Sequence, residues 1–514
     1  MSLLGLPDEL ILNVVHQSRP LGFEALMLGC KQIYAVGSEC IERHNSLRRK
    51  YRAFKFERQP VRMRIGRARD VEAECPKRTQ SSLQLLHIIA KDRLVAEYIE
   101  SINFTNEYTA GEYHARGLES WPAYLESETA VEDVRLLLSK SRCLEEAGID
   151  PEVWLETTAT GTATLLLSLL PNVTEINLGS HFTRHPDPDE LNAALLNTVV
   201  MSARFSPSSP LAQVTSLKTS GQAHSEDRAE LRLLNPFFLL PKLQRLRGSD
   251  FLACDSSMTG IPFEWRNGDL NSNIEEIEMS HSCITGSGPD LASLLPHAPK
   301  LRSFYYCFSP KWHECGHDWD AAAVFRTLER NCGGTLTRLS ITMHHVYGTL
   351  KAGVCSLKHF TRLEYLEMDV RLFYGAPVNT EELQKMREED HAAYTNKIGW
   401  TTADIPSLSD VLPPSMKTVR LITGFGTEEP AILEALFRNA GSMHESLPLL
   451  ENVTVACGTS KVGDEYVKGK NRVHDEEAWR AAGDTIRAAG CSYEEVENVG
   501  PAWLEGLDPS RGPW

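Results

Sequence analysis

The chain has 514 residues and carries 53 Lys and Arg against 69 Asp and Glu, which gives a formal net charge of −16. This length is enough for a large core, or for a small domain followed by an extended array. The negative balance argues against general nucleic-acid binding, so we expect no nucleic-acid partner. No run of about 18 apolar residues occurs, so we expect no membrane span and no membrane partner.

The 12 cysteines are scattered along the chain and form no CxxC pair. This spacing suits free thiols in a reducing compartment better than a disulfide framework. The first residues lack a basic region and include Asp8 and Glu9, which makes a poor signal peptide. We therefore expect a cytoplasmic or nuclear protein.

Two short helical runs are expected between residues 6 and 34. Pro7, followed by Asp8 and Glu9, predicts a helix start, because proline suits the first turn and carboxylates suit the positive end of the helix dipole. The apolar residues that follow fall on one face: Leu10, Ile11, Val14 and Val15. Pro20 ends this helix. A second run from about residue 21 repeats its apolar residues on one face: Leu26, Cys30, Ile33 and Tyr34.

This pattern resembles the F-box, in particular that of filamentous fungi. The matching stretches are Leu6 to Leu10, Ala25-Leu26, Cys30 to Tyr34 and Ile41 to Leu47. The resemblance implies binding to the Skp-type adaptor of an SCF (Skp–cullin–F-box) ubiquitin ligase. It implies these adaptor-binding residues: Leu6, Pro7, Leu10, Ile11, Val14, Val15, Leu26, Cys30, Ile33 and Tyr34. The sequence does not divide residues that contact the adaptor from residues that form the module's own core, and an ordinary helical cap is the alternative.

A basic segment follows this module. Between Arg48 and Arg69, ten Lys and Arg accompany a single Glu, a net charge of +9. Apolar residues in and before this segment repeat at helical spacing, which predicts an amphipathic helix with a solvated opposite face: Ile41, His44, Leu47, Tyr51 and Phe54. An import signal and a nucleic-acid patch are the alternatives. We assign residues 1–46 to an F-box-like helical module and residues 47–95 to a basic helical linker.

A short pattern, apolar-x-x-apolar-x-apolar, returns in ten places along the rest of the chain. Its copies begin at Ile99, Val173, Val214, Leu243, Ile274, Leu301, Leu336, Leu363, Met416 and Leu450. Proline turns precede many copies, and the chain between copies often has helical period. One strand and one helix in roughly 30 residues resembles the irregular leucine-rich repeats found with F-boxes, in which stacked units share a continuous core.

We therefore predict an α/β fold in which a leucine-rich-repeat-like solenoid spans residues 96–500. Its curved parallel sheet would carry helices on the convex side, and residues 501–514 would form a flexible tail. A doubly wound sheet is disfavoured because its strands need apolar residues on both faces, whereas these strands alternate. Insertions are expected near residues 108–160, 254–273 and 373–411.

In strands with this pattern, the residues between the apolar ones point to the concave face. Arg and Tyr are enriched at protein hot spots, so the candidate substrate-binding residues are Arg245, Arg247, Tyr305, Arg338, Tyr365 and Arg420. The same face would carry Glu175, Asn177, Glu276, Glu278 and Glu367. Each of these residues is also compatible with a plain solvent-facing strand position.

The sequence contains no recognised hydrolase, nucleotide-binding or metalloprotease motif. Potential metal ligands gather between Cys307 and Asp318, but their spacing matches no zinc pattern. We therefore predict no catalytic residue, no metal and no cofactor. The predicted function is a non-catalytic subunit of an SCF-type E3 ubiquitin ligase that recognises an unknown protein substrate. The alternatives are a protein-interaction scaffold outside any ligase and an enzyme with an unrecognised site.

Overall fold

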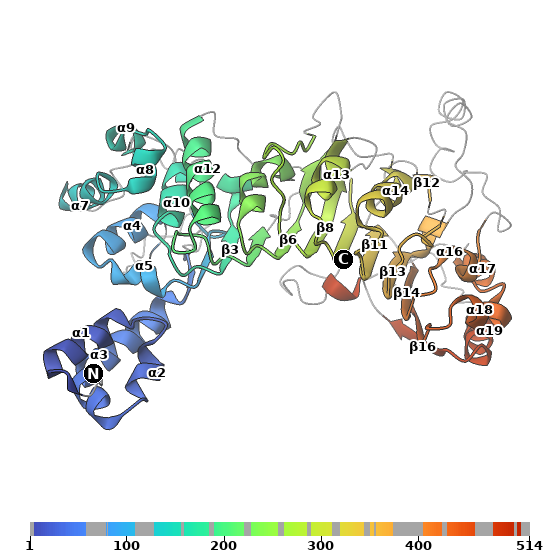
Figure 1. Cartoon of the computed structure of the whole chain (residues 1–514). Coiled ribbons are helices and arrows are strands. Elements are labelled where there is room, and N and C mark those ends of the chain that lie inside the picture. The colour runs from blue at the N-terminus through green and yellow to red at the C-terminus, as the bar shows by residue number, and fades with distance from the viewer. Residues whose placement is uncertain are drawn as a thin grey trace, which may run out of the picture. The chain divides into compact units, whose positions relative to one another are not determined.

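The structure is a computed structural model, and it divides the chain into two compact units (Figure 1). The first unit comprises Met1–Ser220 and Leu239–Leu243, and the second comprises Gly221–Phe238 and Gln244–Trp514. The structure describes residues 5–57, 79, 81–107, 128–155, 159–183, 190–219, 228–254, 262–284, 289–310, 319–343, 350–353, 356–373, 405–423, 429–457, 476–497 and 501–504.

The first unit begins with three helices, which we call the N-terminal module (residues 5–51): α1 (Asp8–Gln17), α2 (Phe23–Met27) and α3 (Lys31–Tyr51). Pro7 precedes α1, and Asp8 and Glu9 lie in its first turn, as predicted. The run predicted from residue 21 is two helices, because the chain is extended at Cys30, with φ −163° and ψ 162°. The Cys30 Sγ accepts a hydrogen bond from the Ile33 N–H at 3.4 Å and so starts α3.

The linker predicted for residues 47–95 is not a separate helix. Its proposed boundary at residue 46 falls inside α3, and Phe54 lies in a strand, β1 (Ala53–Lys55). Phe54 and Phe56 are buried while Arg52 and Lys55 are exposed, so the alternation of a half-buried strand replaces helical spacing after Tyr51. Residues 58–78 of the basic segment lie outside the described residues.

The sheet of the first unit is parallel and follows chain order. Its strands β1, β2 (Ser101–Asn103), β3 (Glu175–Leu178) and β4 (Ser216–Thr219) pair each with the next. The intervening helices are α4 (Ser82–Lys91), α5 (Leu94–Tyr98), α7 (Glu128–Leu138), α8 (Arg142–Glu146), α9 (Pro151–Leu155), α10 (Ala159–Leu167), α11 (Ser180–Thr183) and α12 (Glu190–Phe205). The insertion predicted near residues 108–160 is helical where the structure describes it.

The second unit has a larger sheet of the same kind. Its strands pair in parallel, each with the next in chain order. They are β6 (Arg245–Ser249), β8 (Glu276–Ile284), β9 (Ser303–Phe308), β11 (Arg338–Met343), β13 (Tyr365–Asp369), β14 (Thr418–Thr423), β15 (Asn452–Cys457) and β16 (Ser492–Glu497). Beside them, β7 (Phe251–Ala253) pairs with β5 (Ala229–Glu230) and β8, and β10 (Trp319–Asp320) pairs with β12 (Leu350–Ala352).

The predicted α/β class is confirmed, and every predicted repeat lies at a strand. Chain order within each sheet distinguishes a stack of strand–helix units from a doubly wound sheet, whose strand order reverses at a switch point. The assignment of these units to the leucine-rich repeats stays a prediction. In the parts of the chain that the structure describes, no helix combines the length and hydropathy needed to cross a bilayer.

Helices and short 3₁₀ turns connect the strands of the second unit. They are η3 (Leu231–Leu234), η4 (Pro236–Leu239), α13 (Pro289–Leu294), η5 (Leu295–His297), α14 (Ala321–Cys332), η6 (Val370–Phe373), α16 (Leu408–Val411), α17 (Glu429–Leu436), η8 (Ala440–Ser442), α18 (Met443–Ser446), α19 (Glu476–Ala488) and η9 (Ala502–Leu504). The Asp320 carboxylate caps α14 by accepting the Ala323 N–H at 2.9 Å. Most of the insertion predicted at residues 373–411 lies outside the described residues.

Burial alternates clearly along β14, whereas nearly all positions of β8, β9, β11 and β13 are buried. In β14, Val419 and Leu421 are buried while Thr418 and Arg420 are only partly covered. Figure 1 shows α13 and α14 lying against strands of this sheet, so the apolar side chains pack between sheet and helices. The other face of the sheet is therefore left to the residues between the apolar ones.

Candidate protein-interaction surfaces

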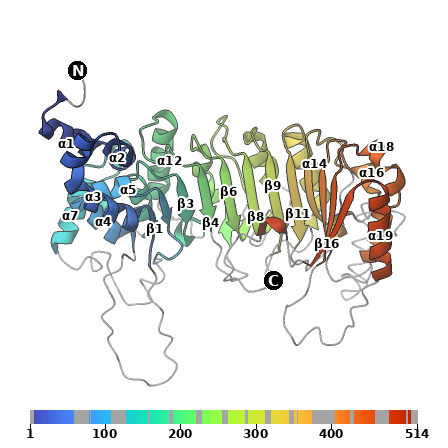
Figure 2. The same ribbon diagram turned by 90° about the horizontal axis from the view of Figure 1, so that it is seen from below.

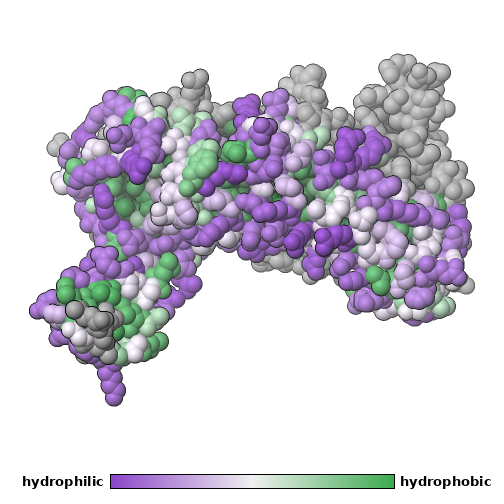
Figure 3. Space-filling view, in the orientation of Figure 1, coloured by the Kyte–Doolittle hydropathy of each residue, from purple (hydrophilic) through white to green (hydrophobic). Residues whose placement is uncertain are grey.

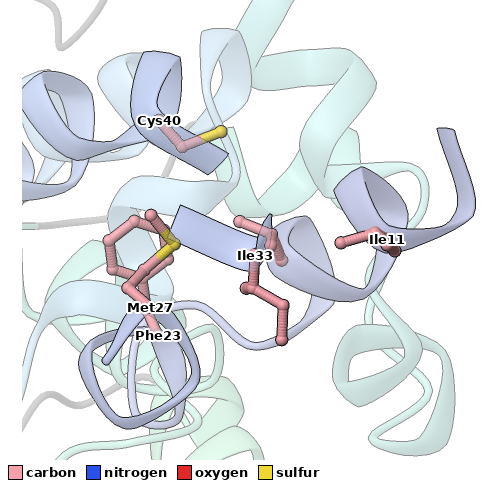
Figure 4. Packing of buried hydrophobic residues seen from close by; sticks show 6 residues of the cluster. Ile11, Phe23, Met27, Ile33 and Cys40 are labelled. Atoms are coloured by element: carbon pink, nitrogen blue, oxygen red, sulfur yellow. The ribbon is translucent and has the colours of Figure 1, made fainter. Parts of the chain in front are cut away.

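The N-terminal module has its own small core, to which each of its helices contributes (Figure 4). The buried side chains are Ile11, Val15, Phe23, Met27, Ile33 and Cys40. Gly37 permits close packing, because a Cβ at this position would lie 2.6 Å from the Met27 Sδ. Three of the predicted adaptor-binding residues, Ile11, Val15 and Ile33, thus lie inside the module.

Other apolar side chains of the module face solvent, and hydrophobic atoms are visible on its surface in Figure 3. Leu10 and Val14, one turn apart on α1, are 47% and 36% exposed. Tyr34, Leu21 and Leu28 are 53%, 71% and 84% exposed. We call these five residues the exposed apolar set. Among the other predicted residues, Pro7 is exposed, whereas three are partly buried against the core: Leu6, Leu26 and Cys30.

A buried polar contact joins α3 to α5. The His44 Nδ1 lies 2.7 Å from the Tyr98 hydroxyl, and the imidazole stacks on Phe23 with ring centroids 4.2 Å apart. Burial lowers the pKa of His44 and raises the pKa of Tyr98 to about 12, so both side chains are neutral at pH 7. Two ion pairs flank the contact, Arg43–Asp92 at 2.8 Å and Arg52–Glu100 at 2.9 Å. The module is thereby attached to the helices and strands that follow it in the first unit.

The sheet of the second unit aligns the residues between the apolar ones into rows. We call one of them the polar row, which runs in register through Arg247, Glu278, Tyr305, Ser340, Glu367, Arg420, Thr454 and Glu494. The adjacent row runs through Arg245, Glu276, Ser303, Arg338, Tyr365 and Thr418. Because strands lie about 4.8 Å apart, neighbours in a row touch. The six predicted substrate-binding residues thus lie in two neighbouring rows.

A charged cluster occupies the β6–β8 end of the polar row. The Arg247 Nη2 lies 3.0 Å from Oε1 of Glu276 and 3.0 Å from Oε1 of Glu278. Burial raises the pKa of Glu278 to about 7, although Arg247 acts in the opposite direction. The net charge of this end of the row therefore depends on pH near neutrality. On the sheet of the first unit, the predicted residue Glu175 pairs with Lys218 at 3.0 Å.

Glu278→Gln is expected to raise the free energy of unfolding at pH 8 and to change it little at pH 5. The folded-state pKa of Glu278 is raised from 4.5 to about 7, so across this window the folded state binds more protons than the unfolded state. The wild type therefore loses stability as the pH rises, by on the order of 2 kcal/mol, and the neutral variant does not. Arg247 keeps Glu276 as a partner in the variant. Urea unfolding of both proteins from pH 5 to 8 measures the difference, and parallel pH profiles would contradict the prediction.

Ser340, Glu367 and Arg420 form a buried network at the centre of the polar row. The Ser340 hydroxyl donates to Oε2 of Glu367 at 2.8 Å, and the Arg420 Nε lies 3.0 Å from Oε1. Glu367 is fully buried and the Arg420 side chain is 13% exposed. The Nε and Nη2 atoms of Arg420 are buried and form no directional hydrogen bond with the described residues, so the contact of Nε with Glu367 is an ion pair.

Aromatic and cationic side chains border this network. The Arg338 guanidinium lies over the Tyr365 ring, 5.8 Å from its centroid. A hydrogen bond to Tyr305 raises the pKa of Arg338 above its ordinary value. Burial raises the pKa of Tyr365, so its hydroxyl stays protonated. The predicted residues Tyr305, Arg338 and Tyr365 are therefore brought into contact beside the buried network.

A segment predicted as flexible tail lies on the polar row. Figure 2 shows the turn η9, in red, against the strands of the sheet. The Ala502 N–H donates to Oε1 of Glu367 at 2.8 Å, and the Trp503 Nε1–H donates to the Ser340 Oγ at 3.0 Å. The ring centroids of Trp503 and Tyr305 are 5.8 Å apart. The tail assignment is therefore wrong for residues 501–504, while residues 505–514 lie outside the described residues.

Sequence reasoning missed Ser340, Ala502 and Trp503 at this site. Ser340 occupies the alternating position of its strand between Leu339 and Ile341, but serine is common on solvent-facing strand positions. Trp503 carried a weak signal, because a large aromatic residue is unusual in a segment that binds nothing. Neither signal identifies a contact partner 163 residues away.

Potential metal ligands and one buried thiol were the remaining candidates for chemistry among the described residues. No group of three His, Cys, Asp or Glu side chains that could hold a metal occurs among them. Burial raises the pKa of the Cys307 thiol to about 11, which keeps it protonated and a poor nucleophile. The segment from His313 to Asp318 and the pair His344–His345 lie outside the described residues.

Comparisons with known proteins assign the chain to no family. No protein-family model matches it, and no curated protein matches it. A function can therefore be inferred only from the sequence pattern and two surfaces, the exposed apolar set of the N-terminal module and the polar row.

Proposed function

We propose that the chain is the substrate-recognition subunit of an SCF-type E3 ubiquitin ligase that acts in the cytoplasm or nucleus. The observation that carries the proposal is the exposed apolar set of the N-terminal module. A helical cap buries its apolar face against the repeats that it covers. This module instead closes its own core and still leaves Leu10, Val14 and Tyr34 in solvent. Exposed apolar side chains gathered on a small domain are typical of a protein-binding surface.

The resemblance to F-boxes indicates the partner of this surface, a Skp-type adaptor. The residues implied by the resemblance then have two roles. Leu10, Val14 and Tyr34 would contact the adaptor directly, whereas the buried Ile11, Val15 and Ile33 would hold the three helices in place. Leu28 joins the proposed contact because it is the most exposed large apolar residue of the module. Leu21 does not, because it lines a hollow with Glu100 and Pro171 of the part of the first unit that follows the module.

The polar row is the proposed surface for a protein substrate. It offers Arg and Tyr side chains, which are enriched at hot spots, on a rigid sheet. The chain would perform no chemistry itself, because in such ligases the ubiquitin thioester is carried by another subunit. Its role would be to hold the substrate at a fixed distance from that thioester.

A protein-interaction scaffold outside any ligase is the second candidate, and the polar row supports it equally well. The two functions differ in what binds the N-terminal module. A scaffold needs no adaptor, and its function would survive removal of the first 45 residues or so.

Co-expression of the full chain with a Skp-type adaptor tests the proposal. We expect the two proteins to co-elute in size-exclusion chromatography as a complex whose mass, from light scattering, corresponds to one copy of each. The adaptor alone and the chain alone are the reference runs. Separate elution at micromolar concentrations of both proteins would overturn the ligase proposal and leave the scaffold.

A further inference from the structure

Residues 501–504 contact the polar row through three groups that belong to different strands. Tyr305 on β9 lies beside the Trp503 ring, Ser340 on β11 accepts the indole N–H, and Glu367 on β13 accepts the Ala502 N–H. Consecutive positions of one row therefore bind one aromatic side chain and the main-chain N–H next to it. We call these three residues, with Arg420, the indole site.

The hydroxyl of Ser340 is oriented by the buried network beneath it. Because Ser340 donates its own proton to Glu367, its oxygen presents lone pairs to the indole N–H. Glu367 in turn is held by Arg420. Each acceptor of the indole site is thus held by a contact within the sheet as well as by residues 501–504.

We propose that the indole site recognises a protein substrate through a tryptophan side chain and the main-chain N–H of the preceding residue, and that residues 501–504 occupy it in cis. This substrate class rests on the proposed function of the polar row. The site prefers tryptophan to phenylalanine because phenylalanine has no N–H for Ser340, and an unmatched buried acceptor costs about tenfold in affinity.

Because residues 501–504 occupy the indole site, a substrate must compete with them for binding. A tethered segment acts at an effective concentration on the order of 1 mM. A free peptide whose intrinsic dissociation constant is about 50 μM would therefore bind the wild-type chain roughly twentyfold more weakly than the vacated site. A substrate must exceed this competition, for example by making further contacts with Arg245, Arg338 or Tyr365 on the neighbouring row.

The experiment compares the full wild-type chain with a full-length variant that vacates the site, Ala502→Pro with Trp503→Ala. Proline removes the N–H that Glu367 accepts, and alanine removes the indole. The probe is a fluorescein-labelled peptide with the sequence of residues 499–507, followed by fluorescence anisotropy. We expect at least tenfold tighter binding to the vacated variant than to the wild type. A probe with Trp503→Phe should bind about tenfold more weakly, because it leaves Ser340 unmatched.

Ser340→Ala in the vacated variant is the matched control for recognition. Without the acceptor, the preference for the tryptophan probe should be lost, because the indole N–H then has no partner and the phenylalanine probe leaves no polar group unmatched. If the vacated variant is folded by circular dichroism and binds the probe no better than the wild type, residues 501–504 are only a structural plug and the inference is wrong.

A second variant covers the case in which the vacated protein does not fold. Trp503→Phe in the full chain keeps the ring contact and loses only the indole hydrogen bond. We expect it to bind the tryptophan probe more tightly than the wild type does, and unchanged binding would overturn the inference. Co-elution with the adaptor is a separate readout. Loss of adaptor binding with intact probe binding would overturn the ligase proposal alone.

Discussion

Glu367→Ala is expected to lower the free energy of unfolding of the second unit by about 3 kcal/mol, because it leaves a buried guanidinium without its counter-charge. The Arg420 side chain is only 13% exposed, and Glu367 provides its ion-pair partner at 3.0 Å. The substitution also removes the acceptor for Ser340 and for the Ala502 N–H. Scanning calorimetry of the full chain measures the change as a lower unfolding temperature of the transition to which this unit belongs.

Glu367→Gln is the matched control, because its amide oxygen still accepts a hydrogen bond while the negative charge is gone. It should destabilise the unit almost as much as Glu367→Ala if charge dominates. Removing both charges, Glu367→Leu with Arg420→Leu, should recover most of the loss, because a buried pair replaced by apolar side chains is often neutral in stability. A double variant whose loss equals the sum of the two single losses would contradict a coupled pair.

The sheet was predictable because its signal is local. A strand that buries one face must alternate, and the triplet Leu339, Ser340 and Ile341 alternates between apolar and polar residues. Each copy adds only a few residues of evidence, but the same pattern in ten places excludes chance alternation. The pattern also predicted which residues share one face of the sheet, since a parallel register keeps equivalent positions in one row.

The helix predicted through Phe54 was wrong because helical spacing and strand alternation overlap in this part of the sequence. Phe54 continues the helical spacing of His44, Leu47 and Tyr51, yet it also begins the alternation that places Phe56 in the core. The chain follows the alternation because β1 can pair with β2, and this gain is invisible in a local window. A helical pattern likewise does not distinguish Leu10 from Ile11, because neighbouring positions both fall within a broad apolar face.

Contacts between residues far apart in the chain could not be predicted from the sequence either. Tyr305 and Glu367 were expected to face solvent, and both are buried. Trp503 lies beside Tyr305, and the Ala502 N–H bonds to Glu367. No composition or spacing rule connects a residue near position 500 with strands β9 and β13. The polar row could therefore be predicted as one face of the sheet, whereas the contact of residues 502 and 503 with its centre could not be predicted from the sequence.

Leu10→Asp with Val14→Asp is expected to abolish co-elution with a Skp-type adaptor while leaving the module folded. Both side chains lie on the solvent-facing side of α1, at 47% and 36% exposure, so a carboxylate there remains hydrated in the free chain. In a complex the same carboxylates would be desolvated without partners, which costs several kcal/mol and more than a hundredfold in affinity. Pull-down of the adaptor and the circular dichroism of the full chain measure the two effects.

Ile11 lies in the core of the module, so its substitution should have a different effect from substitution of the exposed Leu10 and Val14. Ile11→Asp would place a charge in the core formed with Met27 and Ile33, so the helices should separate and adaptor binding should be lost together with the fold of the module. Asn45→Asp with Ser46→Asp adds the same two charges at exposed positions of α3 and should leave binding intact. Only a contact made by the outer face of α1 predicts loss of binding without loss of structure. If Leu10→Asp with Val14→Asp binds like the Asn45 and Ser46 control, that face does not touch the adaptor.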